Sequence, residues 1–413
     1  MRVRRLGGNR AGEIGLTRFL RNEAVSIEEM VSSASALTSA RCAGRRVLVI
    51  QDTTVTRSQG GGGSYLHAAI ALDADDDTLL GLVHAEHLVR GSGKKATRRQ
   101  RAVRDKESGR WLRGADAAAT VCSEARQITV IADRESDIFA AFAECPGDVE
   151  LLVRAAQNRC LEDGGRLFGS LDGLPEAGRV RLDLPAKPGR AARQALLAVR
   201  FAPVELARPR SSATGSGRNP GLPDSLRVTA LDVREVGSSA TPVHWRLLIS
   251  RPVDDLAEAL AVVDLYRRRW AIEQLFRTMK TKGFDIEGVL IAEEAPRQKL
   301  LTATLIAAIT VQQLVHARDG IQGPGPLRPA TDAFTPDDRV LLEAFCRRLE
   351  GRTARQKNPH PKGSLAYAAW VCARLGGWTG YYGKPGPIVL LNGWLQFQAA
   401  KAGANLFRQK HNV

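Results

Sequence analysis

The chain has 413 residues, 44% of them apolar, which suits one large domain with an insertion or two to three domains with real cores. Lys and Arg total 60 against 44 Asp and Glu, and the resulting net charge of +16 favours a polyanionic partner, most often nucleic acid; a basic protein from an arginine-rich proteome is the alternative. The six cysteines form no C-x-x-C pair, which argues against a zinc site or a disulfide framework and favours a reducing cytosol.

Neither the N-terminus nor the longest apolar run predicts a membrane protein. The basic start, "MRVRRLGGNRAGEIG", is followed by no apolar stretch of the signal-peptide kind. The longest apolar run, Leu300–Val311, is too short and too interrupted for a membrane span. We therefore expect a cytoplasmic protein.

The first third of the chain alternates strand and helix signals. Short apolar runs bounded by turn residues predict buried strands, and the acidic stretch Asp75–Asp77 predicts the turn of a hairpin. In chain order we expect a strand over Val47–Ile50 that ends at Asp52, a hairpin over 64–90, a helix over 106–122, a strand over Ile128–Ala132 that ends at Asp133, a helix, and a strand over 148–156.

The rest of the chain changes character twice. Short strand-like segments from about Arg166 to Ser250 indicate a β-rich insertion, with a Gly/Ser/Pro-rich loop at 208–224. Helices are then predicted over Asp254 to about Lys282, Ala295–His316, Asp337–Leu349, Ser364–Leu375 and Gly393–Lys401, with a Pro/Gly linker at 320–330.

The two strand-end aspartates, Asp52 and Asp133, share one setting. Strands buried on both faces belong in the middle of a sheet, and carboxylates at the ends of two neighbouring strands lie side by side. Two close anions repel unless a cation lies between them, and an oxygen-only site suits Mg²⁺ or Mn²⁺. The alternative for either residue is an aspartate that only caps the following turn.

A third carboxylate, Glu273, lies in "YRRRWAIEQLFRTMK". On one continuous helix its polar neighbours fall within about 80° of arc. They are Tyr266, Arg269, Arg277 and Lys280. A separate apolar stripe holds Leu265, Ile272, Phe276 and Met279. The helix is thus expected to pack by its apolar stripe and to present Glu273 among phosphate-binding cations. A solvated face of charge pairs is the alternative.

These segments resemble the bacterial insertion-sequence transposases of the DDE class. "YRRRWAIEQLFRTMK" is similar to that family's Y-x2-R-x3-E-x6-K signature, and "VIQDTT" and "VIADRESDI" are similar to its first and second aspartate motifs. The likeness extends from "GLTRFLRN" to "GSLAYAAWVCARLGG", nearly the whole chain in one order.

The resemblance implies a ribonuclease-H-like α/β catalytic core, in which Asp52, Asp133 and Glu273 bind two Mg²⁺ or Mn²⁺ ions. It also implies DNA contacts, which fall on Tyr266, Arg269, Arg277, Lys280, Arg154 and Trp245. Arg154 corresponds to an arginine near the scissile phosphate, and Trp245 to a tryptophan that holds a flipped base; a core tryptophan is the alternative for Trp245. The implied partners are double-stranded transposon-end and target DNA and a second copy of the chain.

The expected organisation is a short N-terminal region (1–44), the catalytic core (45–320, with the insertion at about 155–250) and a C-terminal helical region (321–413). In that last region an apolar face needs burial on the core or on a second copy. Its residues are Leu365, Ala368, Ala369, Cys372 and Leu375.

The predicted activity is cut-and-paste transposition by end cleavage, hairpin formation and strand transfer. Family members carry several dozen residues before the segment that matches "GLTRFLRN", and these help to recognise transposon ends, so we expect weak end recognition here. The alternatives are a nuclease or resolvase without strand transfer, and a shortened, non-specific DNA-binding regulator or inhibitor of a full-length transposase.

Overall fold

The computed structural model describes residues 6–59, 62–90, 103–184, 191–209, 221–237, 241–280, 283–320 and 327–411. The chain divides into two compact units. Unit 1 comprises Met1–Arg41, Ala71–Leu82 and Glu273–Val413. Unit 2 comprises Cys42–Ile70 and Val83–Ile272.

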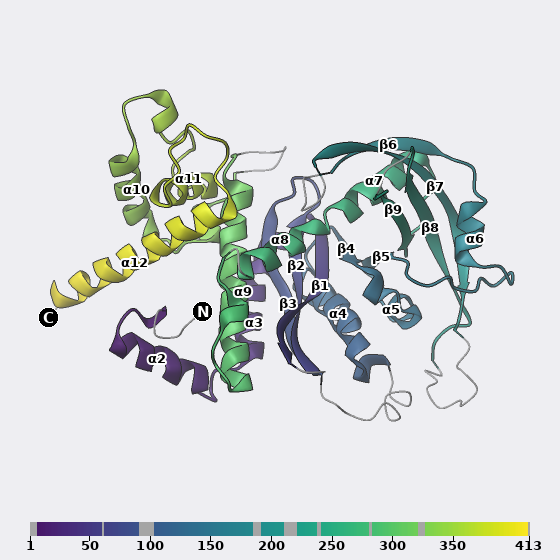
Figure 1. The fold of residues 1–413 in the computed structure, drawn as a ribbon, viewed down its shortest axis with the longest axis horizontal. Coiled ribbons are helices and arrows are strands. Elements are labelled where there is room, and N and C mark those ends of the chain that lie inside the picture. Colours follow the sequence, from purple (N-terminus) through teal and green to yellow (C-terminus); the bar gives the residue numbers. More distant parts are fainter. Residues whose placement is uncertain are drawn as a thin grey trace. The chain divides into compact units, whose positions relative to one another are not determined.

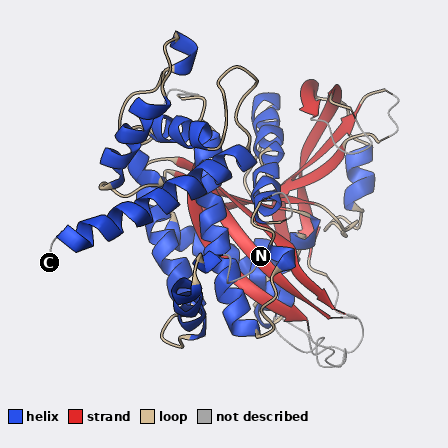
Figure 2. Ribbon diagram, turned by 60° about the vertical axis from the view of Figure 1, so that its left-hand side comes forward, coloured by secondary structure: helices blue, strands red, loops and turns tan. Residues whose placement is uncertain are grey.

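A nine-stranded mixed sheet, in the order β3-β2-β1-β4-β5-β9-β8-β7-β6, dominates unit 2 (Figures 1 and 2). Its strands are β1 Arg46–Gln59, β2 Gly62–Asp73, β3 Leu79–Arg90, β4 Gln127–Ala132, β5 Val149–Arg154, β6 Gly178–Leu184, β7 Arg193–Ala207, β8 Ser225–Glu235 and β9 His244–Ile249. β1, β4 and β5 are parallel, whereas β5, β9, β8, β7 and β6 are successively antiparallel. The predicted α/β class is confirmed in this form, a mixed α/β fold with one large sheet.

The centre of the sheet is apolar because β1 and β4 are covered on both faces. Val49, Ile50, Val130 and Ile131 are fully buried, as expected for parallel strands. Helix α4 (Arg110–Val121) packs on β1, β4 and β5, and α7 (Leu256–Arg267) packs on β7 (Figure 1). The short helices α5 (Phe139–Ala143) and α6 (Leu167–Asp172) complete the α-helices described in this unit.

The four strands β6–β9 fall within the segment predicted to be a β-rich insertion. They extend the central sheet, because β9 pairs with β5 through Val153 and Leu248. Most of the predicted loop at 208–224 and of the linker at 320–330 lies outside the described residues.

Two of the predicted boundaries, those next to Asp52 and Glu273, were wrong in ways that concern the candidate carboxylates. β1 does not end at Asp52 but continues to Gln59, because its later residues pair with β2 after β4 has diverged. The single helix expected over Asp254–Lys282 is two helices, α7 and α8 (Trp270–Met279).

Unit 1 is mainly helical. Its helices are α2 Arg10–Arg21, α3 Ile27–Cys42 (whose last residue belongs to unit 2), α9 Glu294–Ala317, α10 Asp338–Leu349, α11 Leu365–Leu375 and α12 Pro387–His411, besides most of α8. Single 3₁₀ turns in the two units span Val103–Asp105, Glu107–Gly109, Arg134–Ser136, Ile286–Gly288, Ala330–Asp332 and Ala354–Gln356.

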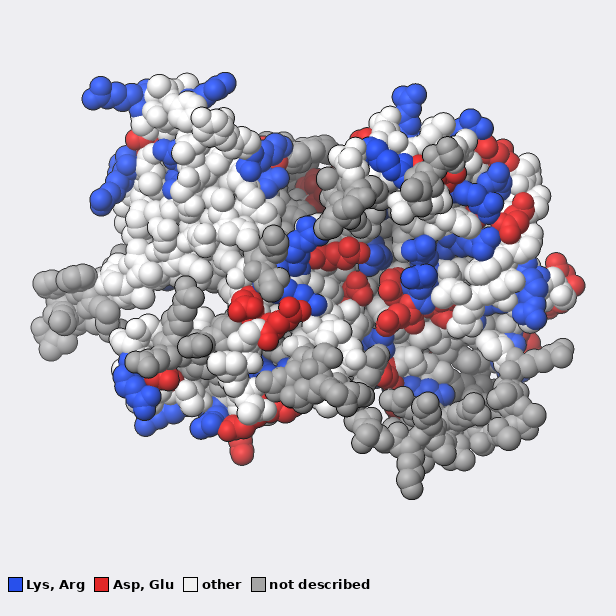
Figure 3. Space-filling model, viewed as in Figure 1, with Lys and Arg blue, Asp and Glu red and all other residues white. Residues whose placement is uncertain are grey.

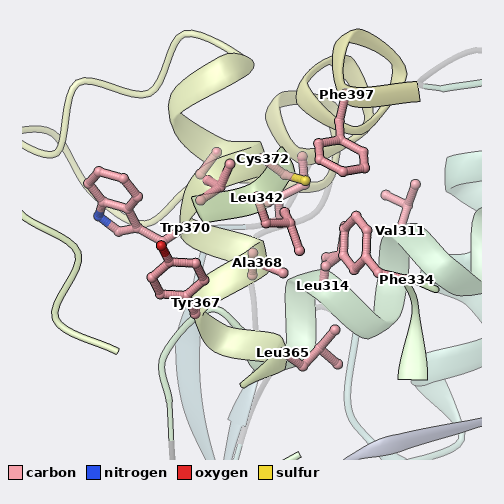
Figure 4. Packing of buried hydrophobic residues seen from close by; sticks show 14 of the residues in the cluster. Val311, Leu314, Phe334, Leu342, Leu365, Tyr367, Ala368, Trp370, Cys372 and Phe397 are labelled. Carbon is pink, nitrogen blue, oxygen red and sulfur yellow. The ribbon is translucent and has the colours of Figure 1, made fainter. Parts of the chain in front are cut away.

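The core of unit 1 surrounds α11 (Figure 4). Leu365, Ala368 and Cys372 are fully buried against side chains of α9, α10 and α12, such as Leu314 and Phe397. The apolar face predicted on this helix is therefore covered within the chain, and it no longer argues for a dimer contact.

Helix α9 (Glu294–Ala317) agrees with the predicted helix Ala295–His316 to within one residue at each end. With 24 residues and a mean hydropathy of 1.5 in its most apolar window, it is long and apolar enough to cross a membrane. Most of that window is nevertheless buried inside the fold, together with Gln312 and Gln313. Gln312 donates to Thr278 Oγ1, and Gln313 donates to the carbonyl of Leu80. Polar side chains satisfied in this way are typical of the core helix of a globular unit.

Candidate active site

Asp52 and Asp133 occupy equivalent positions on neighbouring parallel strands. The register of β1 with β4 pairs Ile50 with Ile131, and each aspartate follows two residues later. Paired strands lie about 4.8 Å apart, so both carboxylates belong to one edge of the sheet. The Asp52 side chain is 18% exposed, and that of Asp133 is partly exposed.

Both aspartates also receive a local backbone hydrogen bond. The Thr53 amide donates to Asp52 Oδ1 at 2.7 Å, and the Glu135 amide donates to Asp133 Oδ1 at 2.8 Å, which makes Asp133 the cap of a 3₁₀ turn. The capping alternative is thus realised for Asp133. A carboxylate has about four acceptor positions, so one amide leaves capacity for a further ligand.

Arg269 brings positive charge to this edge. Its guanidinium lies 3.1 Å from Asp52 Oδ2, with both side chains largely buried. Arg269 is located in the turn between α7 and α8, where backbone bonds connect residues three apart, such as Arg269 N to Tyr266 O and Ala271 N to Arg268 O. These tighter bonds break the predicted helix and invalidate its single polar face.

Tyr266 and Arg154 lie beside Arg269 in unit 2. Tyr266 is buried, and burial raises the pKa of its hydroxyl, partly offset by Arg269 and Arg154. Burial lowers the pKa of Arg154, and nearby Arg134 and Arg269 lower it further. The Arg154 guanidinium donates to the carbonyl of His244 at 2.8 Å. Cations packed this closely are suited to an anionic ligand.

Trp245 is only 7% exposed. Its ring contacts those of Tyr266 and Trp270 edge-on, with centroid distances of 5.4 and 6.5 Å. In this structure Trp245 is therefore a buried tryptophan, as the core alternative for it stated.

The remaining predicted residues belong to unit 1. Glu273 is partly buried on α8, Arg277 is exposed, and Lys280 forms an ion pair with Glu287 at 3.4 Å. The apolar stripe predicted for this helix is buried, with Ile272 and Met279 fully inaccessible. Because Glu273 and the two aspartates lie in different units, their convergence stays a prediction.

Sequence reasoning missed a set of polar residues next to Asp52. Thr53, His67, Arg110 and Glu135 form a hydrogen-bonded chain in unit 2. Burial lowers the pKa of His67 to about 3, so its ring is neutral. The sequence did contain a signal for this set. His67 interrupts an apolar run within a strand, and a polar residue on a buried face needs a hydrogen-bond partner.

The donor set fits a divalent cation. Among the residues that the structure describes, no three His, Cys, Asp or Glu side chains gather into a metal site within the fold. Asp52 and Asp133 nevertheless offer oxygen ligands at one edge of the sheet. The Arg269 guanidinium, itself a cation, already lies beside the Asp52 carboxylate. On the face visible in Figure 3, Lys and Arg are interspersed with Asp and Glu rather than forming one basic patch.

Comparison with known families identifies the chain. Residues 84–309, more than half of it, match the transposase DDE domain. The matched region contains Asp133 and Glu273, and it starts after Asp52. Enzymes of this family act on DNA as polynucleotidyl transferases or nucleases and generally use divalent metal ions. The chain belongs to the DDE transposases.

Proposed function

We propose that this transposase moves an insertion sequence by cut-and-paste chemistry. Water nicks each end of the element, and the freed 3′-OH attacks the opposite strand, which forms a hairpin and releases the flanking DNA. A second water opens the hairpin, and the regenerated 3′-OH attacks target DNA. The proposal is supported above all by the in-register pair of Asp52 and Asp133 on neighbouring parallel strands. Such a pair of carboxylates is suited to metal-dependent phosphoryl transfer.

In the proposed site Asp52, Asp133 and Glu273 hold two Mg²⁺ or Mn²⁺ ions. Bound ions of this kind lower the pKa of a water and stabilise charge on the leaving 3′ oxygen. The three carboxylates would hold these ions in place at the sheet edge, within a core of the ribonuclease-H-like type.

The cations near the carboxylates would bind DNA. Arg154 and Arg269 lie on the side of Asp133 and Asp52, where they can hold the scissile phosphate once DNA displaces the Asp52–Arg269 pair. Arg277 and Lys280 would contact neighbouring phosphates of the transposon end. Tyr266 would support this group by its contact with Trp245.

Hairpin formation needs the terminal base out of the helix, because the freed 3′-OH attacks the opposite strand. We propose that the flipped base stacks on Trp245, and that Trp270 or Tyr266 moves to expose the Trp245 ring. Stacking on an aromatic ring contributes about 1–3 kcal/mol per base.

We further propose that, within the family, the chain belongs with the transposases that carry the Y-x2-R-x3-E-x6-K signature, like that of the composite kanamycin-resistance transposon. The segment "YRRRWAIEQLFRTMK" supports this proposal. By the same analogy a homodimer would synapse the two ends.

The test uses a supercoiled plasmid that carries the DNA flanking this gene on both sides. With Mg²⁺, the wild-type chain should release a fragment whose ends snap back as hairpins on a denaturing gel, and should later insert it into a second plasmid. Asp52→Asn, Asp133→Asn and Glu273→Gln should each lose cleavage by at least about 10³-fold while retaining DNA binding.

The matched control is Asp148→Asn, an exposed aspartate before β5, which should cleave normally. Cleavage without hairpins or insertion would favour the nuclease alternative. Full cleavage by any of the three carboxylate variants would refute the assignment.

A further inference from the structure

We propose that Arg110 is a positioning residue that locks the Asp52 strand to the Asp133 turn. This inference rests on the proposed function of the two aspartates. It assigns a role to a residue outside the motifs, contributed by helix α4.

Arg110 contacts a residue that follows each aspartate closely in the sequence. Its Nε donates to Thr53 Oγ1 at 3.0 Å, and its Nη2 donates to Glu135 Oε2 at 2.6 Å. Thr53 directly follows Asp52, and its amide donates to Asp52 Oδ1. The Glu135 amide donates to Asp133 Oδ1. One guanidinium therefore joins the two residues whose backbone amides hold the two carboxylates.

His67 fixes the Thr53 end of this connection. Its Nδ1 lies 2.9 Å from Thr53 Oγ1, and its Nε2 lies 3.1 Å from Gln51 Oε1. Because the ring is neutral, Thr53 donates its hydroxyl hydrogen to Nδ1 and accepts from Arg110, while Nε2 donates to Gln51. His67 thus forms hydrogen bonds with both residues that flank Asp52 on β1, Gln51 and Thr53.

The burial of Arg110 indicates that its role is more than surface pairing. Its side chain is 5% exposed and its guanidinium lies 4.8 Å from the Trp111 ring centroid, whereas Glu135 is 61% exposed. Desolvating a guanidinium is costly, and an apolar side chain of similar volume commonly serves stability as well or better. A buried, planar, two-armed donor instead fixes relative orientation.

The expected consequence is preorganised carboxylates. Phosphoryl transfer with two ions requires ligands held within a few tenths of an ångström, and supporting hydrogen bonds supply that rigidity. The pairing of β1 with β4 ends at Ile50 and Ile131, and Arg110 connects β1 to the turn that carries Asp133 beyond that point.

The test compares Arg110→Met with Arg113→Met, a neighbour on α4 that pairs instead with Glu86. Mn²⁺ is titrated into each full-length chain and the free ion is followed by electron paramagnetic resonance, with the melting temperature recorded in parallel. We expect the Mn²⁺ dissociation constant to rise about tenfold or more in Arg110→Met and to stay unchanged in Arg113→Met.

Thr53→Val provides a second, nearly isosteric variant in case Arg110→Met does not fold. It removes the hydroxyl between Arg110 and His67 and should weaken Mn²⁺ binding several-fold. Arg110→Lys, which cannot span both acceptors, should restore less than half of the lost affinity in logarithmic terms. A lower melting temperature with wild-type Mn²⁺ affinity in Thr53→Val and Arg110→Met would overturn the positioning role.

Asp52→Asn separates this inference from the proposed function. If Asp52→Asn abolishes Mn²⁺ binding but Arg110→Met and Thr53→Val do not weaken it, only the positioning role is wrong. If Asp52→Asn binds Mn²⁺ as well as the wild type does, the proposed metal site is wrong, and the positioning role falls with it.

Discussion

The Arg269 guanidinium lies 3.1 Å from the Asp52 carboxylate, in a turn that separates α7 from α8. This ion pair joins a proposed metal ligand, Asp52, to a proposed phosphate contact, Arg269. Metal and DNA would therefore act together, because each provides a new partner for one member of the pair.

Arg269→Ala should accordingly have opposite effects on metal binding and on catalysis. Without DNA, its Mn²⁺ affinity should rise about three- to tenfold, because a competing cation is removed from Asp52. Its cleavage rate should fall, because a phosphate contact is lost. Titration of Mn²⁺ and single-turnover cleavage assays measure the two effects.

Arg267→Ala is the matched control, because Arg267 pairs with Asp264 one turn earlier. It should change neither quantity appreciably. Weaker Mn²⁺ binding in Arg269→Ala would mean that Arg269 supports the carboxylates rather than competing for one of them.

DNA binding should be strongly dependent on salt. Each phosphate contact contributes about −0.9 to the slope of log K against log salt concentration. Arg277→Ala should reduce that slope by about one contact, whereas Glu273→Gln should leave binding largely intact. Arg179→Ala, in the β-rich insertion and paired with Glu176, serves as the control. Fluorescence anisotropy at four salt concentrations is sufficient, and a slope unchanged in Arg277→Ala would remove it from the interface.

Gly114 sets how closely α4 approaches β1. A Cβ atom at Gly114 would lie 2.1 Å from Gln51 Oε1, and Gln51 is fully buried and hydrogen-bonded to His67. Gly114→Ala should therefore lower the free energy of unfolding by about 1–3 kcal/mol and weaken cleavage.

Gly169→Ala on α6 is the opposite case, since nothing lies within 4 Å of its added Cβ. It should be neutral or stabilising by up to about 1 kcal/mol. Urea unfolding measures both variants, and equal stability of the two would contradict the close packing of α4 on Gln51.

His67 should make the fold sensitive to acid. Its folded-state pKa of about 3 lies below the ordinary value of 6.5. Above pH 6.5 the ring is neutral in both states, and below it only the unfolded chain takes up a proton, so stability falls as the pH drops toward 3. The loss attributable to His67 is about 1.4 kcal/mol at pH 5.5.

The comparison of wild type with His67→Gln between pH 7.5 and 5.5 isolates this effect from that of other groups. The variant should lose less stability than the wild type over that interval. Identical losses in the two chains would show that His67 takes up a proton in the folded state as readily as in the unfolded chain, contrary to the pKa lowered by its burial.

The sequence predicted those parts of the fold in which local pattern and tertiary environment agree. Ile128–Ala132 was recognised as a buried strand because a parallel strand covered on both faces is apolar throughout. α12 begins earlier than predicted, at Pro387, where proline is favoured at the first position of a helix.

Other features depend on contacts that no local pattern contains. The break between α7 and α8 involves neither Gly nor Pro, and it accompanies the pairing of Arg269 with a residue on β1. Arg110 lies in an ordinary helix start, and its connection to Thr53 and Glu135 appears only once α4 is packed on the sheet. Likewise, only the packed chain shows that α11 is covered by its own neighbours.

The central claim, that Asp133 is a metal ligand for DNA cleavage, is tested most directly by replacing its carboxylate with a thiol. Asp133→Cys should cleave the flanking-DNA plasmid poorly with Mg²⁺ and recover at least about tenfold with Mn²⁺, because Mn²⁺ accepts a sulfur ligand more readily than Mg²⁺ does. Asp148→Cys should show no such preference. Equal cleavage by Asp133→Cys with both metals, at the wild-type rate, would contradict the account.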